Sequence, residues 1–93
     1  MKIDNEILKK YFLSKPVIKA YLFGSFARNE EKTDSDIDIL VELEDNVDLF
    51  QFALIKIELE KLLSRNVDLV SSNGVSPRLK PYIDNEKFLI YEK

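Results

Sequence analysis

The segment from Asp36 to Leu43 constrains the fold of this chain more than any other. It begins with a strict alternation of acidic and aliphatic residues and passes into a short apolar run. Successive side chains of a β-strand point to opposite faces, so the alternation predicts a strand with one buried face. The residues expected to face the core are Ile37, Ile39 and Val41.

Segments with helical and strand-like patterns alternate along the rest of the chain. The predicted helices cover residues 4–14, 25–30, 48–64 and 77–85, and the other predicted strands cover residues 17–23 and 67–70. Residues 88–91 are expected to form a last short strand or a packed tail. Asp4 and Asp48 are the expected N-caps, and Pro81 is expected to end or kink the last helix. This order predicts an α/β (α+β) fold, with helices flanking a small mixed β-sheet of three to four strands.

The length of the chain suits one compact domain over residues 1–93. A chain of this size buries roughly 60–65% of its unfolded surface, so its core is thin. Neither a linker nor an internal repeat interrupts it. Five phenylalanines lie among aliphatic residues and are therefore expected in the core: Phe23, Phe26, Phe50, Phe52 and Phe88.

Two residue types that carry much of enzyme chemistry are absent. Without cysteine, disulfide scaffolds, zinc ribbons and thiol nucleophiles are excluded. Without histidine, serine–histidine–aspartate triads and histidine zinc sites are excluded as well. Any catalysis must rely on carboxylates, lysine, hydroxyls, backbone amides or a hard metal ion.

Charge and hydropathy indicate the expected surroundings of the protein. No apolar run reaches the roughly 18 residues that span a bilayer, and the charged start has no signal-peptide core, so a cytoplasmic location is expected. The net charge is −3, and no more than two basic residues are adjacent. Neither feature is typical of a nucleic-acid-binding protein.

Acidic residues on the predicted strands are candidate metal ligands. Asp36 and Asp38 would project from the same face of one strand, and Asp68 lies in the next. Adjacent carboxylates repel each other unless a cation or a shared proton lies between them, and Mg²⁺ prefers such oxygen ligands. Taken singly, these residues are equally consistent with solvated strand edges.

The dipeptide Gly24-Ser25 follows the predicted strand over 17–23. A strand that ends in this way before a helix presents backbone amides and a hydroxyl to an anion such as phosphate. A simple strand-to-helix turn is the commoner meaning of the dipeptide alone.

Together these features form a recognisable pattern. Gly24-Ser25, ten further residues and then Asp36-Ile37-Asp38 resemble the Gly-Ser-x10-Asp-x-Asp signature of the DNA polymerase β-like nucleotidyltransferase superfamily. The fuller strings Leu22–Glu30 and Ser35–Val41 are similar to the minimal nucleotidyltransferases, which are single domains of about this length. The resemblance extends over essentially the whole chain, including the predicted strand 67–70.

The resemblance implies a role for each acidic residue. Asp36 and Asp38 would hold two Mg²⁺ ions that bridge the triphosphate of ATP. Asp68 would ligate the second ion and help to deprotonate the acceptor hydroxyl. Such chemistry depends on positioning and electrostatics, which need neither histidine nor cysteine.

The resemblance also implies a nucleotide-binding loop. Gly24 and Ser25 would contact the β- and γ-phosphates, and Arg28 would lie near the phosphates or stabilise the loop. Asn29 stands where the family usually has glycine. Asparagine tolerates a left-handed turn better than other non-glycine residues, so the loop backbone is expected to survive this change.

The expected function is that of an ATP-dependent nucleotidyltransferase. Family members like this one commonly act as antitoxins of HEPN ribonuclease toxins, to which they add AMP on a tyrosine. By resemblance, we expect a protein adenylyltransferase antitoxin that forms a hetero-oligomer with a HEPN toxin, without direct contact to nucleic acid or membrane.

Two other functions are compatible with the sequence. One is a non-catalytic antitoxin that neutralises its partner by contact, against which the presence of all three aspartates argues. The other is a nucleotidyltransferase for small molecules, although such enzymes generally carry an added helical domain. Arg78 and Lys80 are expected to be surface charges.

Overall fold

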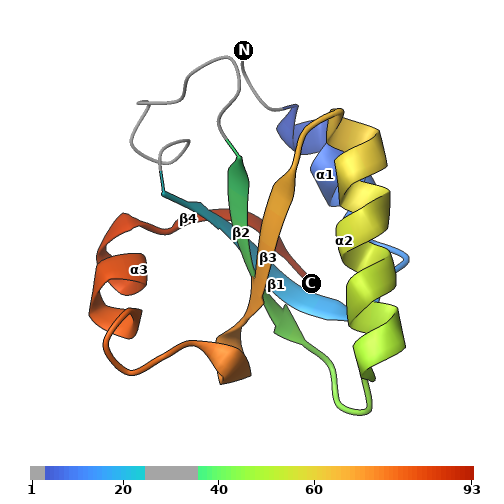
Figure 1. Ribbon diagram of the computed structural model, residues 1–93. Helices are drawn as coiled ribbons and strands as arrows, with labels where there is room; N and C mark the ends of the chain where they lie inside the picture. Colours follow the sequence, from blue (N-terminus) through green and yellow to red (C-terminus); the bar gives the residue numbers. More distant parts are fainter. Residues whose placement is uncertain (1–3, 25–35) are drawn as a thin grey trace.

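The computed structural model describes residues 4–24 and 36–93. Its centre is one four-stranded sheet, with α1 and α2 on one side and α3 on the other (Figure 1). In chain order the elements are α1 (Asn5–Phe12), β1 (Val17–Phe23), β2 (Ile37–Leu43), α2 (Leu49–Leu63), β3 (Val67–Ser71), a 3₁₀ turn (Ser72–Gly74), α3 (Lys80–Glu86) and β4 (Phe88–Glu92). The predicted mixed sheet flanked by helices is confirmed, and the predicted helix 25–30 lies outside the described residues.

The sheet has the strand order β3-β2-β1-β4. β1 pairs antiparallel with both β2 and β4, whereas β2 and β3 run parallel and are connected through α2. The pairing of β1 with β4 shifts register between Ala20 and Tyr21. This irregularity leaves two consecutive residues of β4, Ile90 and Tyr91, buried. β4 therefore buries two neighbouring side chains, whereas strict alternation would bury only one of them.

Side-chain caps define where the two longer helices begin. The Asp4 carboxylate accepts hydrogen bonds from the amides of Glu6 and Ile7. Asp48 and Gln51 form a reciprocal capping box, in which each side chain binds the other residue's backbone N–H. Both predicted caps are confirmed, because capping depends only on residues within one turn.

Pro81 has a different role from the predicted one. It lies in the first turn of α3 and does not end or kink the helix. The first amides of a helix have no partner in the preceding turn, so proline loses no hydrogen bond there. The predicted helix 77–85 is thus shorter at its start and forms over Lys80–Glu86.

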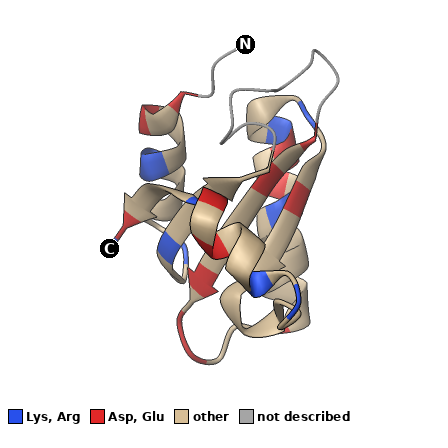
Figure 2. Cartoon of the chain, turned by 90° about the vertical axis from the view of Figure 1, so that its left-hand side faces the viewer, with Lys and Arg blue, Asp and Glu red and all other residues tan. Residues whose placement is uncertain are grey.

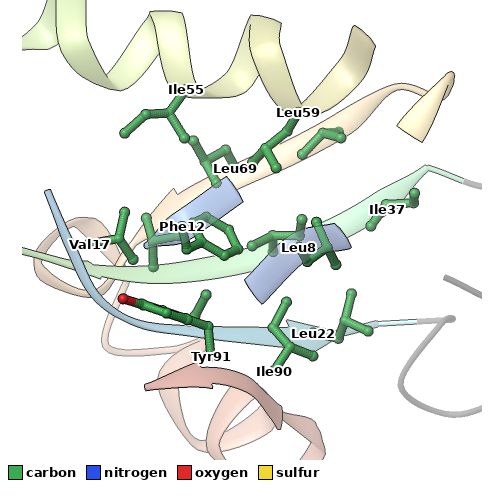
Figure 3. Close-up of a cluster of buried hydrophobic side chains, with 14 of the residues drawn as sticks. Leu8, Phe12, Val17, Leu22, Ile37, Ile55, Leu59, Leu69, Ile90 and Tyr91 are labelled. Atoms are coloured by element: carbon green, nitrogen blue, oxygen red, sulfur yellow. The ribbon is translucent and has the colours of Figure 1, made fainter. Parts of the chain in front are cut away.

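The main core lies between the sheet and the layer formed by α1 and α2 (Figure 3). Ile37, Ile39 and Val41 are fully buried in it, as the alternation predicted. Leu40, on the opposite face of β2, is also buried, because α3 covers that side with Ile83. β2 is therefore shielded on both faces along part of its length.

The prediction that five phenylalanines lie in the core is wrong for two of them. Phe50 is 88% exposed and Phe88 is 58% exposed, while Phe23 and Phe52 are half-buried. Phe26 lies outside the described residues. An apolar side chain does not by itself determine which face of a helix or strand turns inward, and Phe50 lies on the outer face of α2.

Phe12 is fully buried, and the centroid of its ring lies 5.5 Å from that of Tyr91 (Figure 3). On the same side of the molecule, the Tyr11 hydroxyl donates a 2.7 Å hydrogen bond to Glu58 and so ties α1 to α2. Within 4–24 and 36–93, no helix is both long and apolar enough to cross a membrane.

Candidate active site at one end of the sheet

The candidate site lies where β1 ends and where β2 and β3 begin. Phe23, the last residue of β1, is paired with Asp38 near the start of the antiparallel strand β2. This pairing brings Gly24 next to Asp38, although the two residues are fourteen positions apart. The glycine and the second acidic residue of the signature therefore meet through the sheet.

Gly24 is the residue that this contact requires. Its φ angle is +72°, in the left-handed region that side chains disfavour. A Cβ atom at this position would also collide with the carboxylate of Asp38. The backbone thus passes directly against Asp38, which no residue with a side chain permits without displacement.

Asp38 and Asp68 are direct partners in the parallel pairing of β2 with β3. Neighbouring strands lie about 4.8 Å apart, and paired residues point to the same side of the sheet. On either side of these acids, Ile37, Ile39 and Leu69 turn into the core. The two carboxylates therefore share the opposite face, where Asp38 is half-buried and Asp68 exposed.

Asp36 lies one step outside this pair. It immediately precedes β2, is exposed, and lies two residues before Asp38 in the chain. The described part of the chain contains no group of three or more acidic side chains close enough to form a ready metal cage. The structure therefore brings Gly24, Asp38 and Asp68 together and leaves Asp36 beside them.

Two residues that the sequence assigned to nucleotide binding, Ser25 and Arg28, lie outside the described residues, as does Asn29. Gly24 and Asp36, the described residues on either side of this gap, both lie at the candidate site. Figure 2 shows bands of acidic residues on adjacent strands of the sheet.

A cavity of about 250 Å³ lies on the same face of the sheet as the two acids, under α3. Its floor includes Tyr21 and Leu40. These two residues are paired across β1 and β2, two positions along the strands from the pair of Phe23 and Asp38. Lys80 and Lys87 contribute to its wall. Lys80 is exposed, as expected for a surface charge, but it borders this cavity as well.

Tyr21 and Lys87 were not singled out by sequence reasoning. The Lys87 ammonium lies 4.7 Å from the centre of the Tyr21 ring and 3.0 Å from the Asp84 carboxylate. No local pattern brings residues 21 and 87 together. Only the pairing of β1 with β4 does so, and that pairing depends on the tertiary fold.

The family model described as "Polymerase beta, Nucleotidyltransferase" matches residues 5–93. A Methanocaldococcus jannaschii protein, MJ0435, named as a protein adenylyltransferase, is 45% identical over 85 residues, which is 88% of this chain and 91% of the relative. Its name agrees with the reaction class of the matched family.

Two solved structures are similar over most of the chain. A minimal nucleotidyltransferase superposes with a TM-score of 0.80 at 36% identity, covering 90% of this chain and 86% of the other. A structure described as a toxin–antitoxin with AMP-PNP has a TM-score of 0.85 at 24% identity, covering 98% of this chain and 75% of the other. The family match, these similarities and the juxtaposition of Gly24 with the paired aspartates lead to one conclusion: the chain belongs to the polymerase β-type nucleotidyltransferases and has the minimal nucleotidyltransferase fold.

Proposed function

We propose that this protein is an antitoxin that transfers AMP from ATP to a tyrosine hydroxyl of a HEPN ribonuclease toxin. The observation that carries the proposal is the pairing of Asp38 with Asp68 beside the side-chain-free backbone of Gly24. A relative named as a protein adenylyltransferase and a toxin–antitoxin structure of the same fold support the choice of acceptor class. The HEPN partner follows from the resemblance of the sequence to antitoxins of that type.

The donor set of the site fits magnesium. Mg²⁺ takes oxygen ligands, commonly a few carboxylates together with substrate phosphates. Asp38 and Asp68 present carboxylate oxygens from adjacent strands, and Asp36 supplies a third carboxylate at the start of β2. These three residues would hold two Mg²⁺ ions. When bound, the metal neutralises triphosphate charge and lowers the pKa of a coordinated hydroxyl.

The residues of the chain then have distinct tasks. Gly24 lets the backbone pass close to the acids. Gly24 and Ser25 would contact the β- and γ-phosphates. Asp68, the more exposed acid of the pair, accepts the proton of the acceptor hydroxyl. The hydroxyl oxygen bonds to the α-phosphorus while the bond from that phosphorus to the bridging oxygen breaks, and pyrophosphate leaves.

The test is intact-mass spectrometry of the toxin after incubation with this protein, ATP and Mg²⁺. We expect a mass gain of one AMP for each modified tyrosine, abolished by the double substitution Asp36→Ala and Asp38→Ala. Asp45→Asn is a matched control, since Asp45 is an exposed acid in the turn before α2. It should leave the reaction unchanged.

Two further observations make the outcome unambiguous. Omitting Mg²⁺, or adding a chelator, should abolish the mass gain if the carboxylates act through a metal. A stable complex that neutralises the toxin without any mass gain would refute transfer and support neutralisation by contact. Mapping the modified residue to anything other than a hydroxyl side chain would refute the proposed acceptor.

A further inference from the structure

The helix α2 is apolar on both sides. Its inner side buries Ile55, Leu59 and Leu63 against the sheet. Its outer side carries Phe50, which is 88% exposed, and further exposed aliphatic residues. A helix of a monomeric protein normally turns charged and polar residues outward, so a second apolar side indicates a contact surface.

The exposed apolar residues of α2 form a continuous line. Phe50, Leu54 and Ile57 follow one another at spacings of four and three residues, which keeps them on one side of a helix. Lys61 continues the line by another four residues and is also exposed. These four residues are called the outer stripe below.

The charged side chains of α2 outside this line are engaged within the chain itself. Lys56 pairs with Glu60 at 3.1 Å, and Glu58 accepts the hydrogen bond from Tyr11. Lys15 lies 3.0 Å from Glu58 as well. The outer stripe is therefore flanked by charges that already have partners, and its centre can be covered without burying an unpaired ion.

We propose that two copies of this chain associate through the outer stripe, with their α2 helices packed antiparallel about a two-fold axis. With the axis placed midway between positions 54 and 57, Leu54 meets Ile57 of the partner subunit. Phe50 then meets Lys61 of the partner subunit, whose aliphatic stem and ammonium both interact favourably with an aromatic ring. Each contact occurs twice, as an isologous interface requires.

Charge favours the antiparallel arrangement over a parallel one. The exposed acids Asp45 and Asp48 lie just before α2, and Lys61 lies in its last turn. Antiparallel packing brings the acidic end of each helix to the basic end of the other, and it also aligns opposite helix dipoles. A parallel arrangement would bring like charges together.

The area of the surface is sufficient for a weak, reversible dimer. Phe50 is 88% exposed, Leu54 and Ile57 are about half exposed, and Lys61 is exposed as well. At roughly 200 Å² for a fully exposed large side chain, the outer stripe offers roughly 450 Å² per copy. The pair would bury about 900 Å², an area in the range of small, transient interfaces.

Dimerisation through α2 leaves the candidate active site accessible. Asp38 and Asp68 point to the side of the sheet that α3 partly covers, whereas α2 lies on the opposite side (Figure 1). The proposal therefore goes beyond the proposed reaction, and substitutions in the outer stripe test it without touching the catalytic carboxylates.

The first experiment is sedimentation velocity of the full chain over a wide range of concentrations. We expect the average mass to rise from that of one copy toward that of two. Phe50→Lys should weaken this association by roughly 30-fold, because it removes an aromatic anchor and places a second ammonium against Lys61 of the partner subunit. Leu13→Lys is the matched control, because Leu13, the C-cap residue of α1, is 70% exposed and lies outside the stripe.

The second experiment uses the absence of cysteine from the chain. A mixture of the Leu54→Cys and Ile57→Cys variants should form a mixed disulfide faster than either variant forms one with itself. Circular dichroism verifies that each variant is folded. A wild-type chain that is monomeric at every concentration overturns the proposal, as does a Phe50→Lys chain that dimerises normally. Loss of only the toxin complex in Phe50→Lys, with a monomeric wild type, also overturns it and assigns the stripe to the toxin.

Discussion

Replacing Gly24 with alanine should separate the fold of this protein from its activity. The residue has a φ angle of +72°, and alanine in the left-handed region costs about 1–2 kcal/mol. The added Cβ would also collide with the Asp38 carboxylate, and relief of such overpacking typically costs a further 1–3 kcal/mol. We therefore expect the free energy of unfolding to fall by about 2–5 kcal/mol.

Activity should fall further than stability alone explains. The collision is relieved by moving either the Gly24 backbone or the Asp38 carboxylate, both of which belong to the proposed site. Misplacement of a reacting group by about 1 Å commonly costs about 100-fold in rate. The rate of AMP transfer, measured at a temperature where the variant is fully folded, should fall by about this factor.

The chain has only two glycines, so the other one provides the control. Gly74 is exposed, and a Cβ atom there would meet only the Ser71 hydroxyl, at 3.2 Å. Gly74→Ala should therefore change both the free energy of unfolding and the transfer rate little. In an Asp38→Ala background, the stability cost of Gly24→Ala should shrink to the backbone contribution. A Gly24→Ala variant with nearly normal activity and stability would refute this account of the site.

Three further predictions concern the core and the helices that support the site. Asp48→Ala removes the carboxylate that accepts the hydrogen bond from the Gln51 amide in the α2 capping box, and should lower the free energy of unfolding by about 1 kcal/mol in urea titrations. Leu59→Ala empties a fully buried position and should cost about 2–5 kcal/mol in the same assay. The hydrogen bond from Tyr11, and after it the contact with Lys15, lower the pKa of Glu58. These two interactions should therefore stabilise the fold fully above the ordinary glutamate pKa, and the stabilisation should be lost as the pH falls below that value. Thermal unfolding followed against pH should show a shallower acid decline for Glu58→Gln, and an unchanged profile would contradict this role.

Local sequence was sufficient for the positions of most elements. The caps Asp4 and Asp48 bind amides within one turn of themselves, so their function depends on neighbours in the chain. Strict alternation in β2 correctly placed Ile37 and Ile39 in the core, because opposite faces of a strand follow from backbone geometry alone. The same alternation correctly placed Asp38 on the opposite face of β2.

Sequence pattern was less informative where the outcome depended on what packs against an element. Pro81 fits the first turn of α3 only because that helix begins at Lys80 and not earlier. Phe50 is as apolar as the buried Phe12, but it lies on the side of α2 that faces away from the sheet. Hydrophobicity favours burial without specifying which surface is available to provide it.

The composition of the candidate site was therefore determined by the sequence, and its assembly by the tertiary structure. The residue types and the spacing from Gly24 to Asp38 identify the family, because they encode the required chemistry. The contact between these two residues and the pairing of Asp38 with Asp68 arise only when three strands align in register. Register is decided by burying all the apolar faces together, which is a property of the whole chain and not of any segment.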